Sequence, residues 1–194
     1  MAAIDSRTAG VLTPIAGEGT GDPTDALRAW VSGLTGIPLG KVRRRWLSKP
    51  GTRPGIGESW CAVGIERTRT PGTPEQIGRR GQLPEAESGD ARRISHQSLV
   101  CAASFYGPDA QSLADIFREG CQLPQNIDAL RAGCGCALQS VEEDVLHLPD
   151  FLNEQWVDRF DVRFTIGRKV ERTFGVRTLC AVGTNKTFTD RGKL

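Results

Sequence analysis

The sequence lacks the residue patterns that mark most enzymes. It contains no G-x-S-x-G nucleophile elbow, no P-loop, and no G-x-G-x-x-G fingerprint after a strand. His96 and His147 are the only histidines, and Ser95 beside His96 would point to the opposite face of a strand. We therefore expect no catalytic residues and no cofactor, and we do not expect an enzyme.

Long apolar runs are also missing. No stretch of eighteen apolar residues occurs, so we expect no membrane span. The first residues lack a basic segment followed by an apolar one, which argues against a secretory signal. Residues 1–21 are polar and rich in glycine, and we expect them to form a flexible arm.

Cysteine is present but not in a metal-binding pattern. Cys134 and Cys136 form the only close pair, and structural zinc usually needs two such pairs. We therefore expect no metal and no disulfide, and Glu142–Asp144 reads as a solvated turn more readily than as a cation site. A small redox enzyme using the Cys134–Cys136 pair remains an alternative, weakened because no thioredoxin-like βαβ pattern surrounds it. The other cysteines fall in apolar patterns and are expected to be buried: Cys61, Cys101, Cys121 and Cys180.

Helical and strand periodicities alternate along the chain. Asp22-Pro23 starts a helix that ends near Gly36, with Leu27, Trp30, Val31 and Leu34 on one side. A second helix is predicted over 109–122, with an apolar stripe of Ala110, Leu113, Ala114, Phe117 and Cys121, and a short third helix over 126–132. Strands are predicted over residues 41–48, 60–69, 91–106, 136–146 and 156–166, with a further β-forming run over 170–182.

Two predicted strands carry most of the information on the fold. Residues 91–106 are apolar on both sides, which is typical of a central strand. Residues 156–166 alternate, with Phe160, Val162, Phe164 and Ile166 on one face and Arg159, Asp161, Arg163 and Thr165 on the other. Together these patterns predict an α+β fold, a mainly antiparallel sheet with helices packed on one face.

The connections complete this organisation. Strands 41–48 and 60–69 are expected to form a hairpin, residues 70–90 a long loop, and residues 149–154 a turn. We therefore expect a single domain over residues 22–183, preceded by the arm of residues 1–21 and followed by a polar tail over 184–194.

Charge is unevenly distributed. Ten acidic and two basic residues lie between Asp109 and Asp158, although the net charge of the chain is only +2. Such opposite blocks could steer copies of the chain head to tail, or they could cancel within the fold. The arginines could contact phosphates, or they could form cross-strand or intersubunit ion pairs. The charged residues singled out as candidates for a lumen or a subunit interface are Arg43, Arg44, Arg45, Arg159, Asp161, Arg163 and Arg172.

Several ordered blocks of the sequence resemble the phage neck terminator family, which is related to tail terminators. They are Leu34–Ile65, His96–Leu130 with its F-Y-G-P-x-A motif, and Leu148–Val176 with Q-W-x-x-R-x-D. The resemblance implies an α+β terminator fold and a structural role in the virion neck and tail, after assembly in the host cytoplasm. It implies no catalytic residues.

The same resemblance implies a set of partners. Terminators of this kind form homo-oligomeric rings, usually hexamers, which sit on the tail tube protein and join it to the head connector or neck protein. Double-stranded DNA passes through the central hole without sequence recognition. The competing interpretation is a monomeric nucleic-acid-binding module that uses a basic sheet face.

Overall fold

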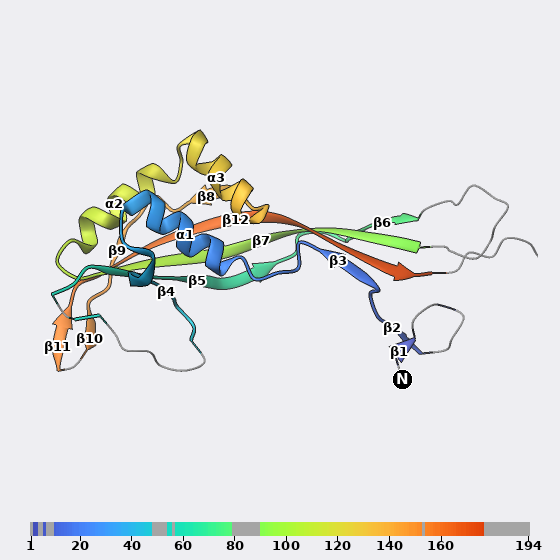
Figure 1. The fold of residues 1–194 in the computed structure, drawn as a ribbon, viewed down its shortest axis with the longest axis horizontal. Helices are drawn as coiled ribbons and strands as arrows, with labels where there is room; N and C mark the ends of the chain where they lie inside the picture. The colour runs from blue at the N-terminus through green and yellow to red at the C-terminus, as the bar shows by residue number, and fades with distance from the viewer. Residues whose placement is uncertain are drawn as a thin grey trace, which may run out of the picture. The chain divides into compact units, whose positions relative to one another are not determined.

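The computed structural model describes residues 2–3, 6, 10–47, 54–55, 57–78, 90–152 and 154–176 (Figure 1). By internal contacts the chain divides into two compact units. The larger comprises Gly17–Glu75 and Ile94–Glu171, and the smaller comprises Met1–Ala16, Gln76–Arg93 and Arg172–Leu194. The boundaries expected at residues 21 and 183 remain a prediction.

The helices of the larger unit are α1 (Thr24–Thr35), α2 (Ala110–Gly120) and α3 (Pro124–Cys134), with a 3-10 turn η1 (Leu39–Lys41) after α1. Pro23 is the N-cap of α1, one residue later than the pattern of an Asp22 cap predicts, and the Oδ1 atom of Asp22 accepts the backbone N–H of Thr24 at 3.0 Å. Gly36 ends α1 in the left-handed conformation, with φ of 74°. In the part of the chain that the structure describes, no helix is both long and apolar enough to cross a membrane.

The third helix differs from the prediction of 126–132. It begins at Pro124, whose missing N–H and fixed φ suit the first turn of a helix, so this proline starts α3. Asn126 does not cap α3; its side-chain amide donates to the carbonyl of Gly120 at 2.7 Å, at the end of α2. The helix runs through Gly133 and ends at Gly135, whose φ is 67°.

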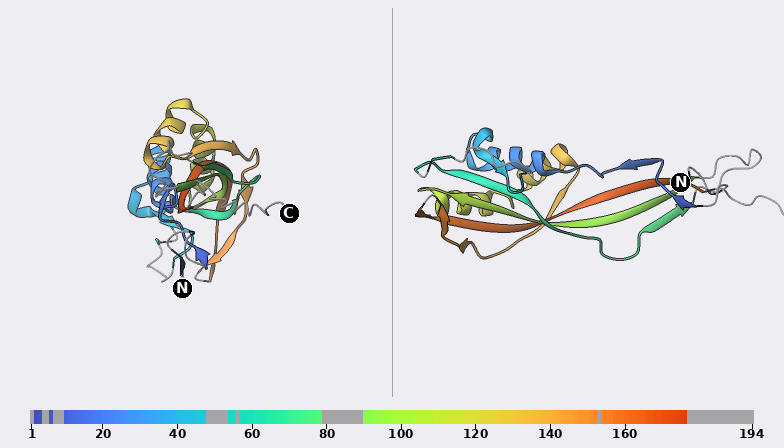
Figure 2. Two further views of the ribbon diagram at one scale, coloured as in Figure 1. Left: turned by 90° about the vertical axis from the view of Figure 1, so that its right-hand side faces the viewer. Right: turned by 90° about the horizontal axis from the view of Figure 1, so that it is seen from below.

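The main sheet is mostly antiparallel, which confirms the α+β class. Its path runs β3-β12-β7-β5-β4, with β6 pairing β7 and with β8 and β9 pairing β12. Figures 1 and 2 show the helices of the larger unit gathered on one face of its strands. The strands are β3 (Ala16–Glu18), β4 (Val42–Arg44), β5 (Trp60–Arg69), β6 (Glu75–Gly78), β7 (Asp90–Tyr106), β8 (Ala137–Val141), β9 (Leu146–His147) and β12 (Arg159–Gly175).

Two further pairs of strands lie outside this sheet. β10 (Asp150–Leu152) and β11 (Gln155–Val157) form an antiparallel hairpin in the larger unit. β1 (Ala2–Ala3) and β2 (Val11–Leu12) pair in parallel in the smaller unit.

The predicted hairpin between residues 41–48 and 60–69 is wrong. β4 pairs β5 in parallel, with Val42 opposite Cys61 and Arg44 opposite Val63. A parallel pair needs a connection long enough to return to the same end of the sheet, and residues 45–59 supply that length. Among residues 41–47, the described part of the predicted strand 41–48, β4 covers Val42–Arg44, and Lys41 belongs to η1.

Other strand boundaries also shift. The predicted strand 136–146 is divided into β8 and β9, and the predicted turn 149–154 is largely strand β10, followed by Glu154 at φ of 63°. The predicted loop 70–90 contains β6, and residues 79–89 lie outside the described residues. β12 is continuous through Gly167 as far as Gly175, with a register shift between Thr165 and Ile166; residues 177–182 are not described.

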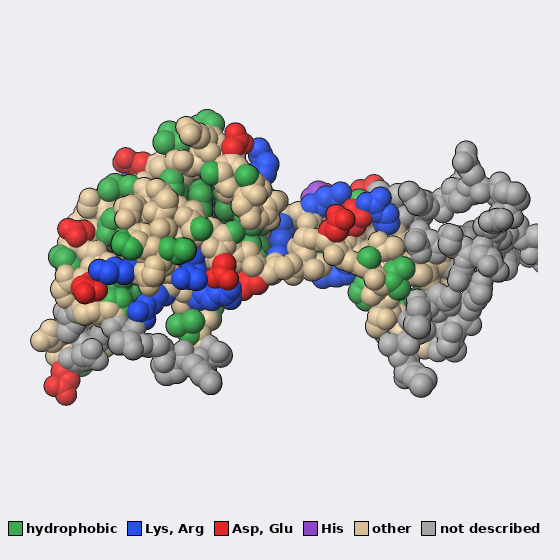
Figure 3. All heavy atoms as spheres, in the orientation of Figure 1, with side chains coloured by type: hydrophobic (Ala, Val, Ile, Leu, Met, Phe, Trp, Pro, Cys, Tyr) green, Lys and Arg blue, Asp and Glu red, His purple; other side chains and the backbone are tan. Residues whose placement is uncertain are grey.

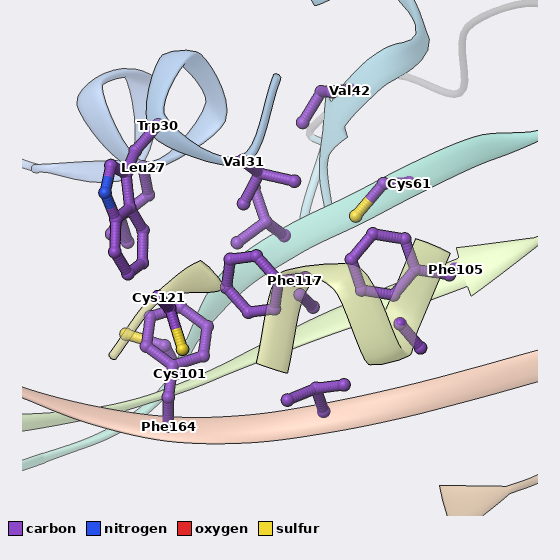
Figure 4. Packing of buried hydrophobic residues seen from close by; sticks show 14 of the residues in the cluster. Leu27, Trp30, Val31, Val42, Cys61, Cys101, Phe105, Phe117, Cys121 and Phe164 are labelled. Carbon is purple, nitrogen blue, oxygen red and sulfur yellow. The ribbon is translucent and has the colours of Figure 1, made fainter. Parts of the chain in front are cut away.

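The core lies between the helices and the sheet (Figure 4). Phe117 of α2 is its centre, with ring centroids 5.5 Å from Trp30 of α1, 5.4 Å from Phe164 of β12 and 5.7 Å from Phe105 of β7. The apolar stripes predicted for the first two helices are confirmed, since Leu34 and Leu113 pack partly buried against the core and all other members are buried.

Truncating the central ring tests this account of the core. We expect Phe117→Ala to lower the free energy of unfolding by about 3–5 kcal/mol, because it removes buried surface and leaves a cavity. Ile116 on the same helix is 46% exposed, and Ile116→Ala should cost no more than about 1 kcal/mol. Urea denaturation of both variants measures the difference, and equal losses would contradict the arrangement.

Candidate functional site: an ion-pair network on the outer face of the sheet

The face of the main sheet opposite the helices carries charged side chains. Along β12, Val162 and Phe164 point into the helix-covered core, so Asp161 and Arg163 point to the other side. We call this side the outer face. It also receives Ser104 of β7, which alternates with the core residue Phe105.

Asp161 is the centre of the network. Its side chain is only 2% exposed, although it lies on the face away from the core. Arg159 binds it with two hydrogen bonds, from Nε to Oδ1 at 2.8 Å and from Nη2 to Oδ2 at 2.5 Å. This bidentate geometry is the strongest form of an arginine–carboxylate pair.

Arg45 joins three strands through its guanidinium group. It follows β4 in the chain and donates from Nη1 to Oγ of Ser104 at 2.7 Å. Its Nη2 lies 3.5 Å from Oε1 of Glu66 on β5 and 3.8 Å from Oδ2 of Asp161 on β12. The side chain of Arg45 is 17% exposed, so these contacts are shielded from water.

Arg163 closes the network at its more accessible side. Its Nε lies 3.2 Å from Oε2 of Glu66, and its side chain is 39% exposed against 24% for that of Glu66. The network therefore contains three arginines and two carboxylates, and its charges are largely compensated within one chain.

The pKa of Asp161 reflects two opposing effects. Burial raises its pKa, but hydrogen bonds from Arg159 and Ser104 and the positive charges of Arg159 and Arg45 lower it by more. The net result is a pKa below the ordinary value, so Asp161 is a carboxylate at neutral pH. Arg159 responds in the opposite sense, because its hydrogen bonds to Asp161 raise its pKa.

An aromatic stack borders the network. The rings of Trp60 and Tyr106 lie parallel, with centroids 4.1 Å apart and planes at 5°. The guanidinium carbon of Arg159 lies 5.9 Å from the centroid of the Tyr106 ring, within the range of a cation–π contact. Ala62 and Val157 complete this small buried cluster.

The structure brings together four of the seven charged residues proposed from the sequence: Arg45, Arg159, Asp161 and Arg163. Arg44 is not part of this network. It links β4 to the start of α1, because its Nη1 lies 3.0 Å from Oδ2 of Asp22 and its Nη2 lies 2.5 Å from Oδ2 of Asp25. Arg43 is half-buried on β4, and Arg172 is exposed on the part of β12 that belongs to the smaller unit. A lumen or interface role for these seven residues remains a prediction.

Two members of the network were missed by sequence reasoning. Glu66 and Ser104 both fall at positions where their strands alternate away from the core, so the alternation itself was the available signal. What the sequence did not supply was the pairing of β5, β7 and β12 that aligns them with Asp161.

The cysteines largely follow expectation. Cys61, Cys101 and Cys121 are buried, and burial raises the pKa of Cys101 to about 12 and that of Cys121 to about 11. Cys180 lies outside the described residues. At the end of α3, the hydrogen bond from Cys136 lowers the pKa of Cys134 to about 6.

Among the described residues no cluster of three or more potential metal ligands occurs, and Glu142–Asp144 is exposed.

Removing the central charge tests the importance of the network for folding. We expect Asp161→Asn to lower the free energy of unfolding by about 3 kcal/mol, because it leaves Arg159 and Arg45 without their shared buried counter-ion. Asp158 offers a matched control: its carboxylate is 66% exposed and pairs with His147 at 3.0 Å. Asp158→Asn should cost less than about 1 kcal/mol. Comparable losses in urea denaturation would contradict a central role for Asp161.

The depressed pKa of Asp161 also makes stability depend on pH. Its carboxylate stabilises the fold above the unfolded pKa of about 3.9, and this contribution is lost as pH falls through the folded pKa. Exposed Asp25 acts in the same direction, because hydrogen bonds from Arg44 and Arg28 lower its pKa to about 2.

We therefore expect the free energy of unfolding to decrease between about pH 4 and about pH 2. In Asp161→Asn the decrease should be shallower. Denaturation at about 1 M salt screens the exposed Asp25 pairs and leaves mainly the buried contribution of Asp161. An unchanged slope in the variant would contradict the assignment.

A family model described as phage neck terminator protein matches residues 23–191. A search of curated proteins finds no matching relative.

Proposed function

Since the chain belongs to the phage neck terminator protein family, we propose that it is the subunit of a ring that caps the tail tube. The ring is hexameric, joins the tube to the head connector or neck protein, and lets double-stranded DNA pass through its lumen. Family membership makes the chain a structural protein of the virion neck and tail that contacts other head and tail proteins. The match over residues 23–191 is the observation that carries the proposal.

The distribution of exposed charge supports association between copies. A closed ring joins two different flanks of each subunit, so complementary flanks favour it. Acidic side chains are exposed from the end of β8 to β12, at Glu142, Glu143, Asp144, Glu154 and Asp158. Exposed basic side chains occur on β5 of the larger unit, at Arg67 and Arg69.

The ion-pair network makes a monomeric DNA-binding module the weaker interpretation. Arg45 and Arg159 already bind carboxylates at short distances, and both side chains are less than one-fifth exposed. A phosphate would have to replace Asp161 or Glu66 as their partner. Arginines that are paired with carboxylates suit a passage through which DNA must slide, because unpaired arginines would bind its phosphates and retain the DNA.

Light scattering coupled to gel filtration tests the proposal. The purified chain should elute as a species of about six times the 21.0 kDa mass of one chain, with a concentration-dependent fraction of smaller species. DNA retention should be weak at physiological salt. A chain that stays monomeric at every soluble concentration and retains DNA would instead be a nucleic-acid-binding module.

Arg163 is the network residue best suited to locating the network within the assembly. Arg159→Glu would place a second carboxylate beside buried Asp161 and unfold the subunit, whereas Arg163 is 39% exposed. Arg163→Glu should keep the circular dichroism spectrum of the folded chain. Lost oligomers would then assign Arg163 to a subunit boundary, and retained oligomers would assign it to the lumen or outer surface.

A further inference from the structure

Two exposed aromatic side chains lie on the β10–β11 hairpin. Phe151 is 57% exposed and Trp156 is 72% exposed. They are directly opposite in the antiparallel register, with ring centroids 5.2 Å apart, so both rings lie on the same side of the hairpin. Exposed tryptophan and phenylalanine in one cluster are typical of a binding hot spot.

The other side of the hairpin is anchored to the subunit. Val157 alternates with Trp156 and is buried against Ala62 and the Trp60–Tyr106 stack on the outer face of the sheet. This anchor holds the hairpin, while the aromatic pair faces solvent. We call Phe151 and Trp156 the aromatic knob.

A groove that could receive such a knob lies between α1 and α3. Small residues leave it open, with Ala29 and Gly33 exposed on α1 and with Ala129 and Gly133 exposed on α3. Its volume is about 470 Å³, and Leu130 and Trp30 form its buried floor. Figure 3 shows hydrophobic side chains at the surface of the larger unit, over the region where Figure 1 draws its helices.

Charge around the knob and the groove is complementary. The knob is flanked on its own hairpin and just beyond it by Asp150, Glu154 and Asp158. A neighbouring hollow of about 330 Å³, which shares Ala26 and Gly133 with the groove, is lined by Arg168 and by Lys169, whose Nζ is paired with Oε2 of Glu171 at 3.4 Å.

The cation of Arg168 is held in this hollow by neutral groups. Its Nε donates to the side-chain oxygen of Gln97 at 3.0 Å, and its Nη1 donates to the carbonyl of Gly21 at 2.6 Å. Asp22 lines the same hollow, but its carboxylate is engaged by Arg44 and Thr24. A positive charge at the end of the groove is therefore available to the carboxylates around a knob.

We propose that the aromatic knob of one copy of the chain docks in the α1–α3 groove of the next copy. The inference deepens the proposed ring and depends on it. Knob and groove belong to opposite faces of the sheet, since Val157 packs on the outer face and the helices cover the inner one, so the contact joins different subunits. Such a contact is heterologous, as a ring requires, and the surrounding charges fix its orientation.

Two single-sided variants test the contact. Phe151→Ser with Trp156→Ser removes the knob and keeps the groove, whereas Ala29→Glu blocks the groove and keeps the knob. Each should weaken self-association roughly thirty-fold or more in sedimentation experiments over a range of concentrations. Circular dichroism and the urea midpoint establish that each variant is folded.

Matched controls separate this contact from general surface effects. Trp46→Ser removes another exposed tryptophan, 67% exposed, and Ala132→Glu adds the same charge to α3 outside the groove. Both controls should associate like the natural chain. If they weaken association as much as the knob and groove variants do, the proposed contact is overturned.

Mixing the two variants gives the sharpest result. Each variant alone is expected to be monomeric. The Phe151→Ser, Trp156→Ser variant keeps an intact groove, and the Ala29→Glu variant keeps an intact knob. A one-to-one mixture should form dimers of about twice the 21.0 kDa chain mass and nothing larger. If knobs paired with knobs, the Ala29→Glu variant would associate as the natural chain does. If the knob docked on a different phage protein, both variants would associate normally. Either result overturns the inference.

The outcomes also separate this inference from the ring itself. If the natural chain forms rings and both variants form them equally well, the knob–groove contact is refuted but the proposed ring is not. A natural chain that is monomeric at all soluble concentrations would refute both.

Discussion

Side-chain alternation along β12 determines how the two faces of the sheet are stabilised. One set of positions delivers Val162, Phe164 and Ile166 to the helices, and the interleaved set delivers Arg159, Asp161 and Arg163 to the other side. The first set is stabilised by burial of apolar surface around Phe117. The second is stabilised by charge compensation around a carboxylate that is almost wholly buried.

This division has a consequence for function. A sheet face with uncompensated arginines would bind nucleic acid on its own, whereas here Asp161 and Glu66 pair with the arginines within the chain. The chain instead exposes carboxylates, the hollow that contains Arg168, and the aromatic pair on the β10–β11 hairpin. These features suit a structural protein of the phage neck that works through contacts with other proteins.

Local patterns predicted much of the fold. The 3.6-residue period placed Phe117 and Trp30 in the core, and the two-residue period assigned the inward and outward positions along β12 around Asp161, because both periods are properties of residues close together in the sequence. The start of the third helix was predicted two residues too late, because a proline can interrupt a helix or begin one, and only the packing of α3 decides that Pro124 begins it.

Non-local pairing was beyond the same reasoning. The parallel register of β4 with β5 is set by contacts between segments separated by a long connection, so a hairpin was the natural but wrong expectation. The same information was needed to bring Arg45, Ser104 and Glu66 to Asp161, and to recognise that Phe151 and Trp156 face each other across a hairpin. Four of the seven charged residues proposed from sequence meet in one network, because three of them share the alternating face of β12.

In the proposed ring, copies of the chain join flank to flank around a central hole. Electron micrographs of the purified full-length chain test it most directly. Class averages should show annular particles with a central opening wide enough for a DNA duplex. A uniform field of single subunits, without annular particles at any concentration, would contradict the account.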